Sequence, residues 1–358
     1  MSFSIERNNL NEFVRIYKCG YNNSCGYYTQ NCWIDDDRLV ISQFRKTKNG
    51  LKESIDFIVV DVAKKTEKHL ITVDILSNGD SNSVVYGKTL YYVKGNNVLC
   101  SINVDTLERK EIYKGDTPIV FPHITADGRF INWYNKENDK DFQTCMRIDL
   151  ETGEVIKMLE KGFLPPFKIA NHFMLSPTNP DLLFFSHEGD TTYITNRLWL
   201  APLGEEPYNI AKQRLDDNGN LLDCFGHESW SADGKGLYFV KYACSPEPPC
   251  GIGYVDLESR EPRILYSKYK YWHVCTAPNG KYLAADLGPN DLDENDISFS
   301  SVCLIDMEKN TEEIIVDVHN NRSHPGHPHP QFNPSCTRIC FHDVIDNGTL
   351  TVGVIDIK

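Results

Sequence analysis

Three histidines lie within six positions of one proline-rich segment, as His324, His327 and His329. Neutral imidazole is a common ligand for divalent transition metals. In an extended segment His327 and His329 point to the same face, because the side-chain period of a strand is two. The prolines between them restrict the backbone and favour extended geometry in the residues before them. The segment is therefore either a stiff pair of metal ligands or a polar surface turn that happens to carry histidines.

The composition narrows the class of protein. The chain has 358 residues and a formal net charge of −13. This acidic balance argues against a nucleic-acid surface, for which a basic patch is expected. No apolar run reaches about 18 residues, so we expect no membrane-spanning helix. The N-terminal segment MSFSIERNNLNEFVRIYKCG has no apolar region of signal-peptide type, so we expect a cytoplasmic protein.

The cysteines predict no zinc or disulfide framework. There are twelve, and none forms a C-x-x-C pair, so neither a thiolate zinc site nor a thioredoxin-like motif is expected. Several, such as Cys145, Cys303 and Cys340, lie in apolar strand-like runs, where free cysteine acts as a small hydrophobic residue. We therefore expect reduced thiols.

Short β-rich runs alternate with turn signals along the whole chain, and helix-period patterns are nearly absent. One unit recurs, in which a strand, an Asp-Gly or Asn-Gly turn and an apolar strand follow one another, as in HESWSADGKGLYFV and WHVCTAPNGKYLAADL. Propeller blades repeat at about this length, and the count comes to about seven. We predict an all-β chain, a single seven-bladed β-propeller over residues 1–358, whose N-terminal strand closes the last blade. A pair of β-sandwiches is the alternative, but it does not explain the histidine register described next.

The turns place histidines at a constant offset. The turn positions taken as equivalent are Thr178, Asp233, Asn279 and Asn333. Counting back six residues from each gives His172, His227, His273 and His327, and the same count in an earlier unit gives Phe121, with His123 at the register of His329. The first strand of each propeller blade lines the central channel, so these histidines should form an arc at its mouth. This favours a functional site over isolated histidines satisfied within the core.

Two further segments bear on chemistry. In SHEGDTTYITNRLWL, His187 and Glu188 follow an apolar strand, and Arg197 precedes Leu-Trp-Leu. An arginine there is either ion-paired on the surface or able to clamp a carboxylate with two hydrogen bonds. The acidic run 286–298 lacks the glycine and terminal glutamate of an EF-hand loop, so we expect a solvated loop. No nucleophile elbow, P-loop or dinucleotide fingerprint is present.

Several of these motifs together resemble one family. The segments YYTQNCW, HFMLSPTNPDLLFFSHEG with the following NRLW, GHESWSADGK, WHVCTAPNGK and HPHPQFNP are similar to those of oligogalacturonate lyases. These are cytoplasmic seven-bladed propellers of the family 22 polysaccharide lyase type. The resemblance covers most of the chain.

The resemblance implies a metal site and two catalytic positions. It implies a manganese-type ion held by His273, His327 and His329, with His324 at the position where the family has a glutamine. An all-imidazole set is softer than the family's usual one, so other transition metals fit it as well. The family's other catalytic positions match His227 and Arg197.

The chemistry implied is β-elimination on a short oligogalacturonide such as digalacturonate. The proton on C5 leaves, the C4 oxygen is expelled, and an unsaturated or 5-keto-4-deoxyuronate product forms. A divalent ion would neutralise the substrate carboxylate and stabilise the developing charge. We predict His227 as the base, with Arg197 as the alternative. We expect Arg197, His172 and His187 to bind the acidic oligosaccharide.

Two other functions stay open at this point. One is a lyase of the same mechanism acting on a different uronic-acid oligosaccharide, which the change at His324 allows. The other is a propeller that only binds a ligand, because a propeller fold hosts many functions. The sequence patterns leave the oligomeric state open.

Overall fold

The computed structural model describes residues 1–8, 10–46, 52–74, 82–135, 141–288, 299–319, 326–345 and 348–357. All regular secondary structure in these ranges is β-strand. The same ranges contain no helix long and apolar enough to cross a membrane. All twelve cysteines are free thiols. The described residues form two compact units, one of residues 1–115 with 277–358 and one of residues 116–276.

Within residues 116–276, three four-stranded sheets follow one another, and in each sheet the strands lie side by side in chain order. The first contains β11 (Ile119–Ile124), β12 (Phe130–Asn135), β13 (Gln143–Asp149) and β14 (Val155–Lys161). The second contains β15 (Ile169–Leu175), β16 (Leu182–Glu188), β17 (Leu198–Pro202) and β18 (Tyr208–Asn209). The third contains β19 (Phe225–Trp230), β20 (Gly236–Lys241), β21 (Gly251–Asp256) and β22 (Arg263–Tyr266).

The other sheets follow the same plan. One contains β3 (Asn22–Ser24), β4 (Arg38–Lys46), β5 (Lys52–Asp61) and β6 (Thr66–Asp74). The next contains β7 (Ser83–Tyr86), β8 (Thr89–Lys94), β9 (Val98–Asn103) and β10 (Arg109–Lys114). A further sheet contains β23 (Tyr271–Thr276), β24 (Tyr282–Leu287), β25 (Phe299–Asp306) and β26 (Thr311–His319).

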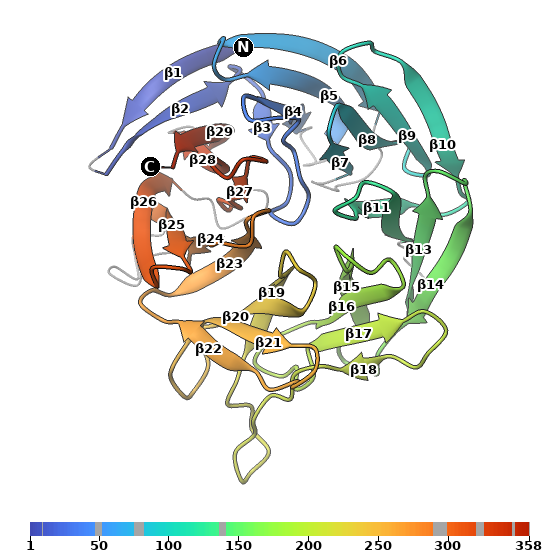
Figure 1. Cartoon of the computed structure of the whole chain (residues 1–358), viewed down its shortest axis with the longest axis vertical. Coiled ribbons are helices and arrows are strands. Elements are labelled where there is room, and N and C mark those ends of the chain that lie inside the picture. Colours follow the sequence, from blue (N-terminus) through green and yellow to red (C-terminus); the bar gives the residue numbers. More distant parts are fainter. Residues whose placement is uncertain are drawn as a thin grey trace. The chain divides into compact units, whose positions relative to one another are not determined.

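The last sheet combines strands from opposite ends of the sequence, which Figure 1 shows as blue beside red. It contains β1 (Ser2–Arg7), β2 (Glu12–Tyr17), β27 (Gln331–Phe332), β28 (Arg338–Ile345) and β29 (Thr349–Asp356). The strand order is β1-β2-β29-β28-β27, so β2 pairs with β29. Pairing β29 in this way covers a strand edge that would otherwise be open. Seven such sheets in the described residues are the strand organisation of a seven-bladed β-propeller.

Apolar side chains between neighbouring sheets form the core. Between the second and third sheets of residues 116–276, Phe184, Leu198, Leu237, Phe239 and Val255 are fully buried. All six residues of β20 are buried, because side chains on both faces of this strand are covered. Burying each large apolar side chain stabilises the fold by about 1.5–3 kcal/mol. This packing fixes the inner strands on which the histidines lie.

A backbone irregularity sets the direction of the predicted histidines. His172, His227 and His329 have positive φ angles of 52°, 46° and 45°, and Phe121 has 49°. In β11, β15 and β19 the pairing register shifts at these points, which marks a β-bulge. A bulge bends the strand and re-aims a side chain, and non-glycine residues at positive φ are strained.

The position of each histidine relative to the following turn corrects one assignment that was made from the sequence. The turn after each first strand is closed by a hydrogen bond from a backbone N–H four residues after the histidine, on Ser176, Ser231, Ala277 and Asn333. Counted back from Asn333, the matching histidine is His329, so the assignment of His327 to this register was wrong by two residues. Cys336, with φ 58°, takes the place that Gly234 and Gly280 have in two of the other turns, which hides the shift in the sequence. His123 correspondingly matches Gln331, and Phe121 matches His329.

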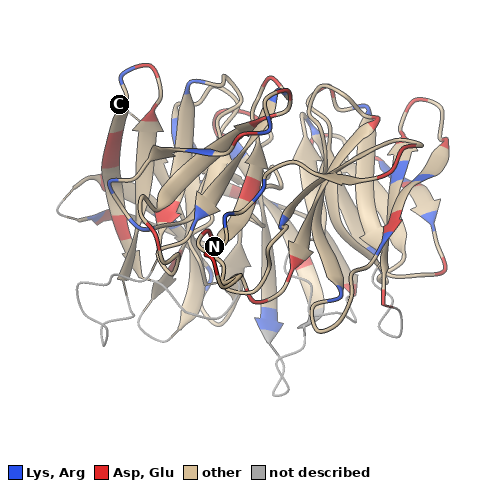
Figure 2. Cartoon of the chain, turned by 90° about the horizontal axis from the view of Figure 1, so that it is seen from below, with Lys and Arg blue, Asp and Glu red and all other residues tan. Residues whose placement is uncertain are grey.

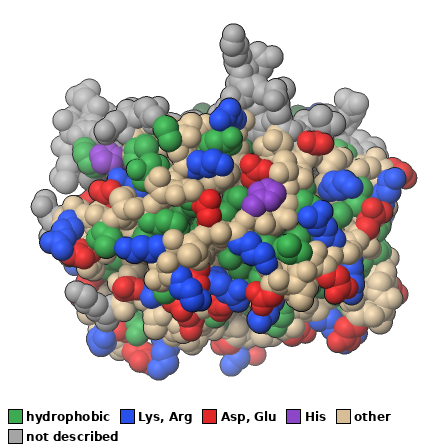
Figure 3. Space-filling view, turned by 90° about the horizontal axis from the view of Figure 1, so that it is seen from above, with side chains coloured by type: hydrophobic (Ala, Val, Ile, Leu, Met, Phe, Trp, Pro, Cys, Tyr) green, Lys and Arg blue, Asp and Glu red, His purple; other side chains and the backbone are tan. Residues whose placement is uncertain are grey.

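Charged residues of both signs are spread over the described chain. Figure 2 shows them in turns and on strands, with acidic and basic residues interspersed. Figure 3 shows the same mixture on one face, where hydrophobic side chains lie between the charges. The electrostatics of a site must therefore come from the groups that lie next to it.

Candidate active site and metal centre

Three imidazoles from successive inner strands form a row. His172 lies on β15, His227 on β19 and His273 on β23. The ring centroids of His172 and His227 are 6.0 Å apart, and those of His227 and His273 are 3.9 Å apart. The structure therefore brings these three predicted residues together, with His227 in the middle.

The contacts of His227 define its tautomer. Its Nδ1 lies 2.8 Å from the carbonyl oxygen of Trp272 and 2.5 Å from the hydroxyl oxygen of Tyr242. A carbonyl oxygen can only accept, so the proton of the neutral ring is on Nδ1 and the lone pair is on Nε2. Burial, together with the charges of His273, His172 and Arg197, lowers the pKa of His227 well below its usual value. His227 is thus held as a neutral imidazole whose Nε2 can accept a proton.

Arg197 lies immediately before β17 in a buried ion-pair cluster. Its Nε donates to Glu228 Oε1 over 2.7 Å, and its two terminal nitrogens each lie 3.3 Å from the oxygens of Glu188. Its backbone N–H donates to Gln213 Oε1. The guanidinium is only 2% exposed, and it is positioned by two carboxylates rather than by solvent.

Glu228 also contacts the row of imidazoles. Its Oε2 lies 2.9 Å from Nδ1 of His172, and Glu228 is fully buried. Burial alone would raise the pKa of Glu228, but the charge of Arg197 and the hydrogen bonds of His172 and Arg197 hold it well below its usual value. The pKa of Glu188 is also lowered, because the electrostatic effects of Arg197 and His172 outweigh the effect of burial. Both carboxylates are therefore ionised, and they raise the pKa of Arg197 despite its burial.

His187 lies apart from this row. Its Nε2 is 2.8 Å from the carbonyl oxygen of Phe167, and its ring stacks on Phe163 with centroids 3.7 Å apart. Burial lowers its pKa. The structure thus uses His187 to hold the loop between β14 and β15, and a contact of His187 with substrate stays a prediction.

The histidine-proline segment before β27 is fixed by a histidine that sequence reasoning did not select. The backbone N–H of Cys25 donates to His342 Nε2 over 3.1 Å, so Nδ1 carries the proton and donates to the carbonyl oxygen of His327 over 3.0 Å. The backbone N–H of His342 donates to Pro328. His329 is held in addition by Asp286 of β24, whose Oδ2 accepts its backbone N–H over 3.1 Å.

Asp286 therefore corrects the prediction of a solvated acidic loop over 286–298. Its side chain is fully buried at the end of β24. The following strand pairing of β24 with β25 holds it in place. Residues 289–298 of that run lie outside the described residues.

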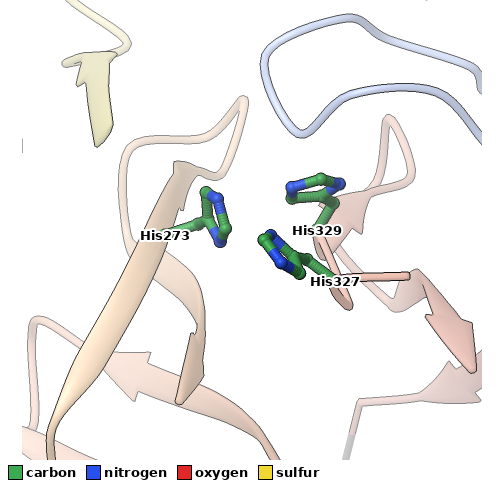
Figure 4. Close-up of side chains that lie close together, drawn as sticks. All are labelled: His273, His327 and His329. Carbon is green, nitrogen blue, oxygen red and sulfur yellow. The ribbon is translucent and has the colours of Figure 1, made fainter. Parts of the chain in front are cut away.

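His273, His327 and His329 form the candidate metal centre. Each offers one ring nitrogen, and these nitrogens lie within 4.8 Å of one another. Figure 4 shows the three rings directed toward a common point, His273 from β23 and the other two from the segment before β27. The exposed fractions are 0%, 4% and 1%, so little water reaches the rings. Three converging imidazoles are a donor set suited to a divalent transition metal, and the residues present fit such an ion.

The fourth predicted ligand cannot be placed. His324 lies outside the described residues, so its part in the metal centre stays a prediction. Sequence reasoning also missed Glu228, Tyr242, Asp286 and His342. Glu228 had a signal, since it follows His227 in an inner strand where a charged side chain requires a partner. Tyr242, Asp286 and His342 come close to the site because separate parts of the chain pack together. No local sequence motif marks such residues.

The chain is a β-propeller that carries a candidate metal centre, and solved structures share its fold. A solved oligogalacturonate lyase in complex with manganese matches with a TM-score of 0.80 at 19% identity, covering 100% of this chain and 96% of that one. The oligogalacturonate lyase of Vibrio parahaemolyticus matches with a TM-score of 0.78 at 16% identity, covering 100% and 98%. These likenesses confirm the all-β, seven-bladed propeller fold.

Curated sequences point the same way. The chain is similar to an oligogalacturonide lyase of Pectobacterium atrosepticum and an oligogalacturonate lyase of Dickeya dadantii. Each is 24% identical over 291 residues, which cover 72% of this chain and 72% of the relative. No protein-family model matches the chain. The resemblance to oligogalacturonate lyases that the motifs indicated is confirmed.

Proposed function

We propose that this protein is a metal-dependent lyase that cleaves short oligogalacturonides by β-elimination. The observation that carries the proposal is the buried triad of His273, His327 and His329 beside the neutral imidazole of His227. The similarity to oligogalacturonate lyases, one of them solved with manganese, supports both the substrate class and the metal. The cytoplasmic location stays a prediction.

The triad supplies the binding site for the substrate carboxylate. A divalent ion bound there would neutralise the carboxylate on C5 and so make the C5 proton more acidic. Manganese is the ion we propose, since the solved relative holds it. His327 and His329 lie on one braced segment, so these two ligands are preorganised for the ion.

His227 is the proposed base. Its Nδ1–H is engaged by Trp272 and Tyr242, which directs the lone pair of Nε2 away from the backbone. A neutral imidazole beside the candidate ligand His273 is in the correct protonation state to accept the C5 proton. Burial and neighbouring positive charge, which lower the pKa of His227, keep it neutral at pH 7.

Arg197 suits a supporting electrostatic role better than that of a base. Its pKa is raised well above the usual value by two carboxylates, so it does not give up its proton at working pH. A substrate carboxylate reaches the guanidinium only by replacing Glu188, whose two contacts are longer than that of Glu228. We therefore propose that Arg197 organises Glu228 and balances charge, and that it binds substrate through the edge facing Glu188.

The test is an assay of the purified protein with digalacturonate and with a glucuronate-containing disaccharide. The expected result is an unsaturated uronate that absorbs near-ultraviolet light, formed from digalacturonate and abolished by EDTA. Elemental analysis of the same preparation identifies the bound ion. If the protein cleaves the glucuronate-containing disaccharide but not digalacturonate, its substrate is a different uronide. Tight ligand binding without any product would show a binding propeller instead.

A further inference from the structure

Two aromatic side chains at the surface lie on loops that adjoin the candidate site, and we call Phe167 and Tyr193 the aromatic pair. Phe167 is in the loop between β14 and β15, and Tyr193 is in the loop between β16 and β17. Their rings stack with centroids 6.3 Å apart and an interplanar angle of 28°. Tyr193 is 70% exposed, so a large part of the aromatic pair is open to solvent.

Phe167 is held beside the carboxylate cluster. Its carbonyl oxygen accepts a hydrogen bond from His187 Nε2 over 2.8 Å. Its ring lies against Gly189, where an added Cβ would come within 2.6 Å of the ring. His187 and Gly189 are the two sequence neighbours of Glu188, which contacts the guanidinium of Arg197. Phe167 therefore touches both neighbours of a carboxylate that belongs to the candidate site.

The loop that carries Tyr193 is tied to Arg197. The backbone N–H groups of Tyr193 and Ile194 both donate to the carbonyl oxygen of Asp190. Ile194 is buried, and its carbonyl oxygen accepts a hydrogen bond from Gln213 Nε2 over 2.8 Å. Oε1 of the same glutamine accepts the backbone N–H of Arg197. The exposed ring of Tyr193 is thus presented by a hydrogen-bonded loop, and an exposed apolar surface beside a site is typical of ligand contact.

The substrate of the proposed reaction offers a matching surface. An oligogalacturonide longer than two units extends beyond the pair of sugars whose bond is cleaved, so its further units lie against the surroundings of the site. In galacturonate the hydrogens on C3, C4 and C5 share one face of the ring, because the C4 oxygen is axial on the other face. Such C–H groups pack favourably on the negatively polarised face of an aromatic ring. The aromatic pair supplies a ring of this kind next to Glu188.

The charges near the aromatic pair suit an acidic sugar. Lys161 Nζ lies 5.5 Å from the ring centroid of Phe163, which is in the same loop as Phe167. Lys161 therefore brings a positive charge to this loop. The carboxylate of Asp190 is engaged within its own loop, because its Oδ1 accepts hydrogen bonds from the backbone N–H and the hydroxyl of Thr192. A sugar carboxylate is thus attracted on one side and meets a carboxylate that already has hydrogen-bond donors on the other.

We propose that Phe167 and Tyr193 form a stacking subsite for a galacturonosyl unit outside the pair whose bond is cleaved. This inference rests on the proposed lyase function and assigns the preference for chain length to these two residues. Tyr193 supplies the exposed ring, and Phe167 is the positioning residue that fixes it. The subsite takes no part in proton transfer, so it acts on KM for longer substrates rather than on kcat.

The experiment compares digalacturonate with trigalacturonate. Digalacturonate fills only the cleaved pair, whereas trigalacturonate also has a unit for the subsite. The variants are Tyr193→Ala, which removes the ring, and Tyr193→Phe, which keeps the ring without its hydroxyl group. The matched control is Tyr86→Ala, which removes an exposed tyrosine on β7. Circular dichroism verifies that each variant is folded, and calorimetry measures the affinity for trigalacturonate independently of turnover.

We expect Tyr193→Ala to raise KM for trigalacturonate about tenfold and to change KM for digalacturonate less than about twofold, because one stacking contact is lost. Tyr193→Phe and Tyr86→Ala should match the unaltered protein with both substrates. An unaltered KM for trigalacturonate in Tyr193→Ala would overturn the proposal and leave the aromatic pair as a contact for another macromolecule. An equal rise of KM for both substrates would overturn it as well.

The outcome for the subsite can be told apart from the outcome for the proposed function. If the unaltered protein cleaves both substrates while Tyr193→Ala shows no change, only the subsite fails. If the unaltered protein cleaves neither substrate, the proposed function fails. In that case a calorimetric affinity for trigalacturonate that is weaker in Tyr193→Ala would still support the subsite, and equal affinities or no binding would overturn it.

Discussion

The carbonyl oxygen of Trp272 accepts a hydrogen bond from His227 Nδ1 over 2.8 Å, one residue before the candidate metal ligand His273. One backbone segment therefore carries a metal ligand and sets the tautomer of the neighbouring imidazole. His227 and the candidate ligand His273 are thus connected through a single peptide unit of β23. The roles of the two histidines can be separated by experiment, because His227 and His273 can be replaced one at a time.

The first prediction concerns His227. Replacing it by asparagine, which tolerates the φ of 46°, should leave the bound metal unchanged and lower kcat by at least 100-fold, because proton abstraction is lost. The measurement is product formation from digalacturonate alongside elemental analysis. A variant that turns over normally would remove His227 as the base.

The second prediction concerns the metal centre. His273→Ala should lose both the ion and activity, because it removes one of three converging ligands. Mass spectrometry with inductively coupled plasma measures the ion, and re-addition of Mn²⁺ should rescue EDTA-treated unaltered protein but not the variant. The matched control is His69→Ala, a largely exposed histidine on β6, which should keep both. Full activity in metal-free protein would contradict the metal role.

The third prediction concerns Tyr242, the second contact of His227 Nδ1. A Cβ added at Gly226 would come within 2.3 Å of the Tyr242 hydroxyl oxygen, so Gly226→Ala must displace this ring. We expect Gly226→Ala and Tyr242→Phe each to lower kcat about tenfold, which corresponds to one hydrogen bond of roughly 1.4 kcal/mol. The double variant should be no worse than the more damaged single variant, since both act on one contact. If the losses of kcat were additive, Gly226→Ala would act through something other than the contact between Tyr242 and His227.

The fourth prediction is a dependence of stability on pH that arises from His123. Its buried ring, hydrogen-bonded to the carbonyl of Phe121, has a pKa lowered to about 4 by burial, against the unperturbed 6.5. Between these values the unfolded chain binds the proton and the folded chain does not. Stability from this residue is therefore full above pH 6.5 and falls as the pH decreases toward 4.

Integrated from pH 7 to pH 5, this loss is about 2 kcal/mol. The variant His123→Gln should lose correspondingly less stability over that interval in urea unfolding experiments. An identical pH profile for His123→Gln would contradict the depressed pKa.

The fifth prediction concerns Arg197. Arg197→Gln leaves Glu228 and Glu188 without their shared cation inside the protein. Breaking a buried pair from one side typically costs about 3–5 kcal/mol, so we expect a clear fall in the unfolding midpoint as well as lost activity. The double variant Arg197→Gln with Glu228→Gln should recover part of that stability. Failure to recover any would mean that the cluster contributes through packing rather than charge.

Much of the fold could be predicted from the sequence, because the same strand-turn-strand pattern recurs in successive blades. Turns such as Asp233-Gly234 mark the same point in successive blades, and Gly234 has the positive φ that such a turn requires. The register failed only in the last blade, where Cys336 replaces glycine and the count moved from His329 to His327. One substitution in a turn was enough to hide a two-residue shift.

The candidate site was predicted only in part, for a physical reason. Residues of the repeated strand position, His172, His227 and His273, share a local signature and were found. Residues that brace them do not: His342 reaches the segment of His327 from β28, and Asp286 reaches His329 from β24. Such partners are defined by packing across strands, and spacing along the chain carries no trace of them.

The pairing of β2 with β29 has a consequence for biosynthesis. During translation β2 leaves the ribosome early, while β29 emerges only after six other sheets have been made. Until then β2 presents a bare backbone edge together with the apolar side chains of Phe13 and Ile16, which the finished sheet buries. Nascent chains stalled before residue 349 should therefore aggregate or recruit a chaperone, and release of the full-length chain should end that dependence.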